Sequence, residues 1–316
     1  MHKLCTCTVA AIALLAVGTQ RSTAAEFITF GGGPTGGTYY AISTGLAKIF
    51  NAKVKNIEAR VRATSGAFEN PVLASAGKID LGPTNANLAV WAHDGIEVYK
   101  GKQQPNISLF MGGLAGGLLH IVVLADSPIK SVADLKGKRV AVGPQGNTTV
   151  LMMNQFLGTY GIAPNAYTPV YVNFNDGFSA LADGNVDAAI ANNAPPVPAI
   201  KEVGIRKSIR LVSVPDDKRK AFLDRYPFYR DGVLAKSVYG TAADIATLGT
   251  SNIIIVRKDL NADLVYNMVK AAYENLDDLR AAHPSARVIK IENAAKGGLA
   301  PHPGAARYFK ERGVLK

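Results

Sequence analysis

The sequence predicts a two-lobed α/β protein with a cleft between the lobes and a hinge at its base. Short runs rich in β-branched residues alternate with helical patterns along the chain, as in proteins that pack helices against a sheet. Several of these runs are too apolar to be half-exposed, which favours parallel-rich sheets covered on both faces. Residues 125–130 and 240–251 are short polar or small-residue segments, and we expect them to carry the chain between the lobes.

The expected strands, in chain order, lie at residues 27–30, 57–62, 119–125, 139–142, 170–172, 188–191, 209–212 and 252–256. The expected helices lie at residues 38–50, 67–76, 132–135, 148–160, 178–183 and 263–283. The last of these helices has the clearest pattern, because apolar residues recur at spacings of three and four and form one stripe. The stripe consists of Leu264, Met268, Ala272, Leu276 and Leu279.

Two crossover segments imply that one lobe is built from the two ends of the chain and the other from its middle. On this reading, lobe one comprises residues 26–126 together with residues 252–316. Lobe two comprises residues 127–251, including the hinge crossovers. A chain of this length supplies enough residues for two such lobes.

The first 25 residues have the pattern of a cleaved secretory signal peptide. A short basic start precedes an apolar run over residues 4–17, and small residues follow up to Ala25. The run is shorter than the roughly 20 residues that a membrane-spanning helix needs. Cys5 and Cys7 both lie in this segment, so the mature chain has no thiol for a disulfide or a thiolate metal site. We expect an exported, periplasmic protein.

Composition and charge narrow the classes of partner. The chain of 316 residues is 48% hydrophobic and 19% charged, which excludes a mainly disordered protein. Its formal charge of +11 falls to +9 when Lys3 and Arg21 leave with the signal peptide. No basic platform interleaved with aromatic residues concentrates this charge, so nucleic acid is not an expected partner. A modest positive surface suits anionic solutes over a short, screened range.

A glycine-rich loop leads from the first strand into the first helix. Gly31, Gly33 and Gly36 match a G-x-G-x-x-G pattern, and Glu58 lies near the distance at which dinucleotide-binding folds carry an acid. Pro34 is unfavourable for that interpretation, and no Gly-Lys-Ser/Thr follows as in a Walker loop. The loop is also typical of a helix start whose free N–H groups suit a carboxylate. An exported nicotinamide-dependent oxidoreductase and a carboxylate-binding protein both stay open here.

Three further small, polar turns lead into helices, at residues 64–67, 143–149 and 192–196. Each turn alone is explained by capping and turn chemistry. Four such turns in one chain favour a ligand site, because ligands of open α/β sheets bind outside the carboxyl ends of the strands.

Residues able to carry catalysis are scattered along the chain. The mature chain lacks both a cysteine and a G-x-S-x-G elbow, so no candidate nucleophile emerges. Its histidines do not have the spacing of a zinc site; they are His93, His120, His283 and His302. The acidic pairs at residues 216–217 and 277–278 are interpreted as solvated faces. We therefore expect a binding protein, without enzymatic activity, metal or cofactor.

The motifs, taken in order, resemble one family over nearly the whole mature chain. Residues 36–40 (GGTYY) look like the signature of TAXI proteins, the solute receptors of one branch of the tripartite ATP-independent periplasmic (TRAP) transporters. Further segments resemble the later blocks of the family, in chain order: residues 64–70, 73–87, 135–143 with 146–149, 181–189 with 194–195, and 302–305 with Tyr308. The resemblance implies a type II periplasmic-binding fold, in which two lobes close on one small solute.

The same resemblance implies a small carboxylate ligand, such as glutamate or 2-oxoglutarate, and delivery to the integral membrane subunits of a TRAP transporter. The ligand-binding residues that it implies are Gly37, Thr38, Tyr39, Ser65, Gly66, Asn70, Asn85, Asn147, Thr148, Thr149 and Asn193. The chain departs from the family pattern at Ala67, Asn147, Thr148, Asn192 and Asn193. These positions belong to the expected cleft, so the ligand need not follow the family. A receptor for an ABC transporter or for a sensory kinase is the alternative with the same fold.

Overall fold

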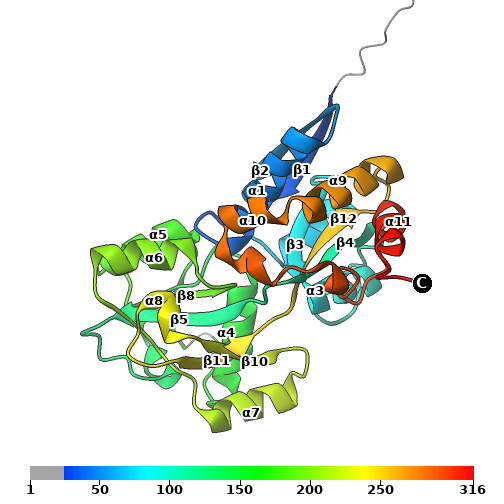
Figure 1. Ribbon diagram of the computed structural model, residues 1–316. Coiled ribbons are helices and arrows are strands. Elements are labelled where there is room, and N and C mark those ends of the chain that lie inside the picture. Colours follow the sequence, from blue (N-terminus) through cyan, green and yellow to red (C-terminus); the bar gives the residue numbers. More distant parts are fainter. Residues whose placement is uncertain (1–24, 165) are drawn as a thin grey trace, which may run out of the picture.

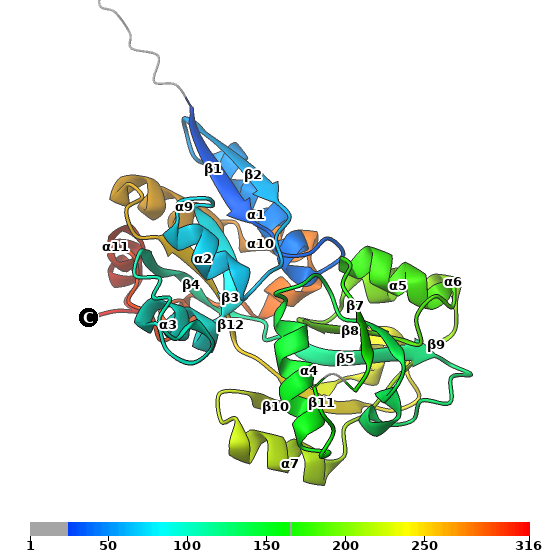
Figure 2. The ribbon, with the colours of Figure 1, turned by 180° about the vertical axis from the view of Figure 1, so that it is seen from behind.

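The computed structural model describes residues 25–164 and 166–316, which form two α/β lobes side by side (Figure 1, and from behind in Figure 2). The predicted signal peptide, with its two cysteines, lies outside the described residues except for Ala25. Over the described ranges, no helix combines the length and the apolar character needed to cross a bilayer.

The first lobe is built on a five-stranded sheet with the order β2-β1-β3-β12-β4. Its strands are β1 (Glu26–Gly31), β2 (Ile57–Arg62), β3 (Leu81–Asn85), β4 (Ile107–Leu114) and β12 (Asn252–Arg257). β1 runs parallel to β2 and β3, whereas β12 runs antiparallel to β3 and β4. A strand from the C-terminal part of the chain therefore completes a sheet begun by the N-terminal part.

Successive side chains of β12 point to opposite faces, and helices cover both faces. Ile254 packs in the core under α1 (Thr38–Lys53), α9 (Ala262–Glu274), α10 (Leu276–Ala282) and α11 (Pro303–Glu311). Ile253 and Ile255 pack in the core under α2 (Glu69–Ser75) and α3 (Ala86–Asp94). Three short 3₁₀ helices complete the lobe: η1 (Glu97–Tyr99), η3 (Pro284–Val288) and η4 (Ile291–Asn293).

The second lobe is built on a sheet with the order β10-β11-β5-β8-β6-β7, in which β9 also pairs with β5. Its strands are β5 (Leu118–Leu124), β6 (Arg139–Ala141), β7 (Thr168–Val170), β8 (Ala188–Asn193), β9 (Ile209–Leu211), β10 (Arg230–Leu234) and β11 (Ile245–Gly249). β6 runs parallel to β7 and β8, whereas β5 runs antiparallel to β8, β9 and β11.

Helices cover both faces of this sheet as well. On one face, α4 (Thr148–Gly158) and α7 (Asp216–Arg225) pack over Leu119 and Ile190. On the other, α5 (Phe174–Ala182) and α6 (Pro198–Arg206) pack over Leu118 and Ala191. A 3₁₀ helix, η2 (Val132–Leu135), and the short α8 (Lys236–Tyr239) lie in the connections. The fold confirms the α/β architecture predicted from the sequence.

The chain crosses between the sheets twice, at residues 115–117 after β4 and at residues 250–251 after β11. The two crossings are joined by a hydrogen bond from the Thr250 N–H to the Gly117 carbonyl (2.8 Å). The predicted lobe boundary at residue 126 differs from this division, because β5 pairs in the second sheet. The limits of the lobes as moving units stay a prediction.

Several elements differ from the sequence prediction. Both sheets are mixed rather than parallel-rich, because β5 and β12 return antiparallel to their neighbours. The helix expected at residues 263–283 ends its first part before Asn275, whose φ of −125° leaves the helical region. Its side-chain amide donates instead to the Ala271 carbonyl (2.8 Å). The expected crossover at residues 240–251 contains β11, and β3, β4 and β10 are strands that the sequence patterns do not predict.

Candidate functional site

The glycine-rich turns and helix starts predicted from the sequence gather where the two lobes meet (Figure 2). Gly36, just before α1, has a φ of +78°, in the region that favours glycine. A Cβ at this position would lie 2.0 Å from Oδ1 of Asn175, at the start of α5 in the other lobe. Glycine at position 36 is therefore required both by the turn and by the close approach of the lobes.

The first turns of α1 and α4 each contact the opposite lobe through a polar side chain. The Thr38 hydroxyl donates to the carbonyl of Ala194. Asn147 is the N-cap of α4, where its Oδ1 accepts from the Thr149 N–H (2.8 Å). The Nδ2 of the same side chain donates to the Ser65 carbonyl in the first lobe (2.8 Å). One asparagine thus caps a helix and joins the lobes, which explains its burial.

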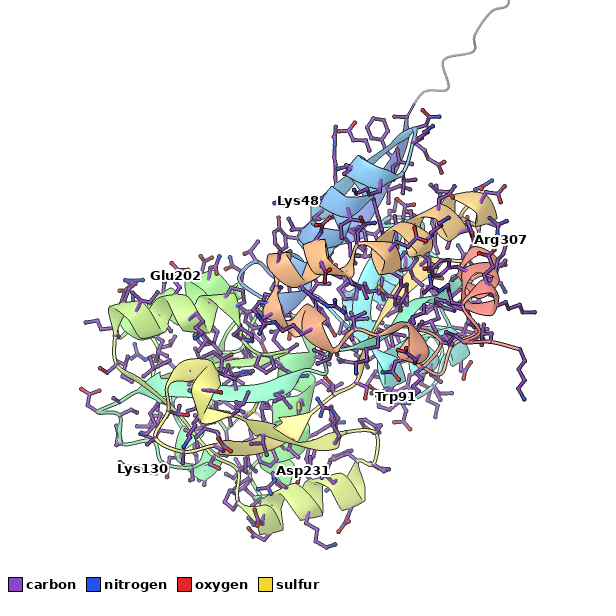
Figure 3. The ribbon with its side chains drawn as sticks, viewed as in Figure 1. Lys48, Trp91, Lys130, Glu202, Asp231 and Arg307 are labelled. Atoms are coloured by element: carbon purple, nitrogen blue, oxygen red, sulfur yellow. The ribbon has the colours of Figure 1, made fainter. Side chains whose placement is uncertain are left out.

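Two further contacts join the lobes at other points of their interface. The His283 Nε2 lies 2.9 Å from the Pro196 carbonyl, to which it donates. The Trp91 ring meets the Phe228 ring edge-to-face, with the centroids 4.4 Å apart and the planes at 83°. Trp91 lies on the side of the first lobe that is turned toward the second (Figure 3). The lobes are therefore in contact, and the described arrangement is a closed one.

A buried set of hydrogen bonds connects the first lobe to the second crossing. Asn252 donates through Nδ2 to the Ala115 carbonyl (2.7 Å), and its Oδ1 accepts from the Tyr39 hydroxyl (2.9 Å). Asn85 donates through Nδ2 to Asn252 Oδ1 (2.8 Å) and to the Thr250 hydroxyl (3.1 Å). We call these residues, Tyr39, Asn85, Thr250 and Asn252, the asparagine network. It ties the ends of β3, β12 and α1 to both crossings.

A small cavity lies beside the asparagine network, with a volume of about 10 Å³. That is about the space of one water molecule. Its walls come from both lobes and from the first crossing: Thr38, Tyr39, Ile42, Leu114, Ala115, Ala194, Asn252, Ser285 and Ile289. In the closed arrangement the predicted ligand residues therefore pack mainly against one another.

The structure brings most of the predicted ligand-binding residues to this interface. Those at the starts of α1 and α4, at the turn before α2 and at the ends of β3 and β8 are Gly37, Thr38, Tyr39, Ser65, Gly66, Asn85, Asn147, Thr148, Thr149 and Asn193. Asn70 differs, because its side chain is used within the first lobe. Its Nδ2 donates to the carbonyls of Gly31 (3.1 Å) and Pro83 (2.8 Å), and its Oδ1 accepts from Thr64.

Three polar residues at the interface escape the sequence prediction of site residues: Asn192, Thr250 and Asn252. Asn192 and Thr250 belong to segments that the sequence analysis marked as small and polar, and Asn252 begins a predicted strand. The Asn192 N–H donates to the Thr149 hydroxyl (3.1 Å), so Asn192 adjoins a predicted residue. One sign of these residues is present in the sequence, because Asn and Thr are concentrated at residues 192–193, at the end of β8, and at residues 250–252, at the second crossing.

The buried polar residues of the interface are neutral. Within the part of the chain that the structure describes, the buried set contains Asn, Ser, Thr and His but no Asp, Glu, Lys or Arg. Burial strongly raises the pKa of the Tyr39 hydroxyl, which stays protonated and able to donate. Burial lowers the pKa of His283, so this imidazole is neutral near pH 7. No group of His, Cys, Asp and Glu among the described residues has the arrangement of a metal site.

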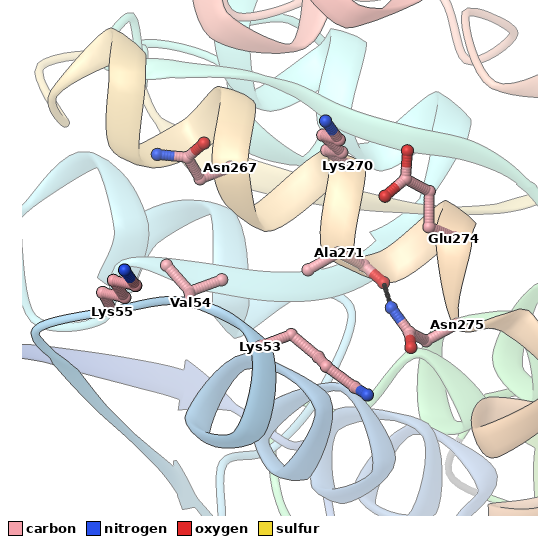
Figure 4. A pocket seen from close by; sticks show the side chains of 8 residues that line it. All are labelled: Lys53, Val54, Lys55, Asn267, Lys270, Ala271, Glu274 and Asn275. Atoms are coloured by element: carbon pink, nitrogen blue, oxygen red, sulfur yellow. Dashed lines mark hydrogen bonds between the residues drawn. The ribbon is translucent and has the colours of Figure 1, made fainter.

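A larger hollow, of about 620 Å³, lies away from this interface on the outer face of the first lobe. It opens between the end of α1 and α9, and Lys53, Lys55, Lys270 and Glu274 project around it (Figure 4). Open to solvent and remote from the second lobe, it has no part in contacts between the lobes. The candidate site is therefore the interface, despite its smaller cavity.

Comparisons with known proteins agree with this architecture. A solved structure described as a periplasmic transporter is 15% identical and covers 92% of this chain and 94% of its own, with a TM-score of 0.56. An ancestral arginine-binding protein bound to arginine is 18% identical and covers 83% and 98%, with a TM-score of 0.50. The alkanesulfonate-binding protein SsuA from Xanthomonas axonopodis pv. citri is 19% identical and covers 91% and 85%, with a TM-score of 0.47.

The first two likenesses concern the fold, which is the type II periplasmic-binding fold with two mixed sheets and the chain crossing twice between them. The sequence comparison concerns the family. A family profile matches residues 30–313, which is nearly the whole described chain and both lobes. The protein belongs to the NMT1-like family.

Proposed function

We propose that this protein is a periplasmic solute receptor of the TAXI type, which captures a small carboxylate between its lobes and delivers it to the membrane subunits of a TRAP transporter. The observation that carries the proposal is that the starts of α1 and α4, one from each lobe, both contact the opposite lobe beside a buried neutral network. Helix starts offer free N–H groups and partial positive charge to an anion. Hydroxyls of Thr38 and Thr149 lie at these same starts.

Capture follows from the contacts between the lobes. The part carrying β1–β4 and β12 moves relative to the part carrying β5–β11, and the two crossings at residues 115–117 and 250–251 act as the hinge. A ligand held by both lobes shifts the equilibrium toward closure by its greater affinity for the closed form. Micromolar affinity, about −8 kcal/mol, suits a receptor that must also release its ligand.

The order of motifs along the chain supports the TRAP branch. Residues 36–40, 64–70 and 302–305 carry the TAXI-like blocks, and the NMT1-like match spans all of them. The predicted signal peptide supports a periplasmic location. Uptake of the captured acid into vesicles that contain the neighbouring membrane protein tests the transporter type. Uptake that requires ATP would favour an ABC transporter, and ligand-dependent activation of a membrane kinase would favour a sensory role.

The ligand class is tested by a thermal-shift screen of residues 26–316 against dicarboxylates, 2-oxo acids, hydroxy acids and amino acids. We expect a rise in Tm with at least one acid, followed by a micromolar Kd in titration calorimetry. A rise with NAD or NADP and none with any organic acid would overturn the proposal in favour of a dinucleotide-binding protein.

The same titration locates the site. Tyr39→Ala and Thr149→Ala remove side chains from opposite lobes, and each is expected to weaken binding about tenfold or more, by removing a hydrogen-bonded group of the site. Asn267→Ala is the matched control, because Asn267 is exposed on α9 at the outer hollow. Unchanged affinity in both Tyr39→Ala and Thr149→Ala would exclude this interface as the ligand site.

A further inference from the structure

The direction of each hydrogen bond in the asparagine network is fixed by one backbone carbonyl. The Ala115 carbonyl can only accept, so the Asn252 group that faces it must be the Nδ2 donor (2.7 Å). The other end of that amide, Oδ1, must then accept, and it faces Asn85 at 2.8 Å. The Asn85 atom that points to it is therefore Nδ2. The orientation of Asn85 follows from the network and not from a choice between equivalent atoms.

This orientation leaves the Asn85 carbonyl oxygen as an acceptor without a donor among the described residues. Asn85 is only 3% exposed, so bulk water does not reach this atom. An unpaired buried carbonyl costs about 1–3 kcal/mol, which makes such an atom uncommon in a well-packed interior. The other end of the same amide makes bonds to Thr250 and Asn252, so the side chain is held rigidly.

A second buried amide, that of Asn192, lies near Gly117 and Thr250, which belong to the two crossings. Both polar atoms of the Asn192 side chain, Oδ1 and Nδ2, are buried without a partner among the described residues. A Cβ on Gly117 would lie 2.8 Å from Asn192 Oδ1 and 2.7 Å from the Thr250 hydroxyl. The side chains of Asn192 and Thr250 therefore flank the space that the missing Cβ leaves. Asn85 of the first lobe and Asn192 of the second therefore each hold unpaired polar atoms near the second crossing, whereas the Thr250 hydroxyl is paired with Asn85 and Asn252.

We propose that the ligand presents a hydrogen-bond donor, a hydroxyl or an amine, to the unpaired Asn85 Oδ1. This inference rests on the proposed function and names the ligand class within it: hydroxy or amino carboxylates rather than oxo carboxylates. The helix starts hold the carboxylate, and Asn85 Oδ1 binds the donor substituent. Asn192 can donate or accept, because no protein partner fixes its amide orientation.

An oxo analogue is disfavoured for a specific reason. Its carbonyl oxygen has no proton to give, so Asn85 Oδ1 would stay buried and unpaired against another acceptor. Asn85 cannot turn its amide around to donate, because Nδ2 is held by Asn252 Oδ1. Sites built to bond a hydroxyl or N–H discriminate strongly against analogues that lack it. We expect the donor-bearing acid to bind at least about tenfold more tightly than the matched oxo acid.

The test compares matched acids on the whole mature protein by titration calorimetry. One set is 2-hydroxyglutarate, glutamate and 2-oxoglutarate; a second, for a shorter ligand, is lactate, alanine and pyruvate. The proposal is supported if, in whichever set binds, the hydroxy or amino acid binds more tightly than the oxo acid. Comparing the hydroxy acid with the amino acid then shows whether the donor is a hydroxyl or an amine. An oxo acid that binds as tightly as both partners, or more tightly, overturns this inference and leaves the proposed function standing. Absence of binding by every organic acid overturns both.

A variant separates recognition from a merely structural role. Asn85→Ala removes the acceptor, so the ratio of affinities for the donor-bearing and oxo acids is expected to fall toward one. If Asn85 only supports the fold, all members lose affinity by the same factor and the ratio is kept, which contradicts the proposal. Asn267→Ala, on the exposed side of α9, should keep both the affinities and the ratio. Should Asn85→Ala fail to fold, Gly117→Ala displaces the Thr250 hydroxyl that holds Asn85 Nδ2, and it is expected to lower the same ratio.

Discussion

Two regions near the junction of the lobes differ in their chemistry. At the crossings, the asparagine network joins buried amides and hydroxyls through hydrogen bonds of fixed direction. At the aromatic contact, Trp91 and Phe228 meet edge-to-face, and Leu151 of the second lobe packs in the same cluster. Hydrogen bonds depend on direction and partner, whereas apolar contact depends on area. The network is therefore suited to recognition, and the aromatic contact to reversible closure.

The two regions also differ in what is lost when their contacts are broken. Opening the aromatic contact exposes apolar surface, which costs about 25 cal/mol per Å² and leaves no unpaired group. Breaking the network leaves buried donors and acceptors without partners, at about 1–3 kcal/mol for each. The network also lies largely within the first lobe and the crossings, so it can persist when the lobes part. Substitutions in the network should therefore mainly lower the free energy of unfolding, whereas substitutions at the aromatic contact should mainly affect closure.

The largest effect is expected for Asn252→Leu, at the centre of the network. It leaves the half-buried Ala115 carbonyl without its donor and removes the acceptor of both the Tyr39 hydroxyl and Asn85 Nδ2, although Asn85 Nδ2 keeps its bond to the Thr250 hydroxyl. We expect the free energy of unfolding to fall by about 2–4 kcal/mol. Urea unfolding followed by circular dichroism measures this loss. Asn267→Leu, at an exposed position, should change it by less than about 0.5 kcal/mol. Equal losses in the two variants would show that the network contributes no special stability.

The fold was predictable where a local pattern decides the structure. β2 matches its predicted range, and the starts of α1 and α4 match theirs, because polar turns with glycine precede apolar helices. β3 and β4 escape the patterns because Pro83, Gly112 and Gly113 interrupt their apolar runs. Their place is decided by pairing with β12, which comes from the far end of the chain. Such long-range pairing overrides local propensity.

The candidate site was predictable only in part, for the same reason. Resemblance to a family supplies Thr38, Tyr39 and Asn85, which lie at helix starts. The partner of Asn85 is Asn252, 167 residues away, and the antiparallel register of β3 and β12 brings the two side by side. No spacing in the sequence encodes that register. Which atoms are left unpaired depends on the orientation of Asn252, which only the position of the Ala115 carbonyl settles.

A smaller effect is expected at the aromatic contact, and it should concern closure. Phe228→Ala removes one ring of the pair, and we expect a loss of about 1–2 kcal/mol in stability. Trp91 is the sole tryptophan of the chain, so its fluorescence reports this contact directly. Its emission should shift to longer wavelength in the variant, because the ring gains contact with water. Ile205→Ala, at a residue 87% exposed on α6, should leave the emission unchanged. Identical spectra for Phe228→Ala and the wild type would contradict a closed contact at Trp91.

The smallest effect is expected at the polar contact of His283 with Pro196, and it should depend on pH. Burial lowers the pKa of His283, so the unfolded chain takes up this proton at a higher pH than the folded one does. Stability from this group is therefore full above the ordinary histidine pKa of about 6.5 and is lost as the pH falls below it. His283→Gln cannot take up the proton, so the variant should lose less stability than the wild type between pH 7.5 and pH 5 in urea unfolding.

His120 and His302, whose pKa values burial also lowers, are present in both proteins, so their contributions cancel in the difference. The Trp91–Phe228 contact has no titrating group, so Phe228→Ala should run parallel to the wild type over the same range. Parallel curves for His283→Gln instead would mean that the imidazole is equally basic in the folded and unfolded chain, and that its bond to Pro196 does not depend on its charge.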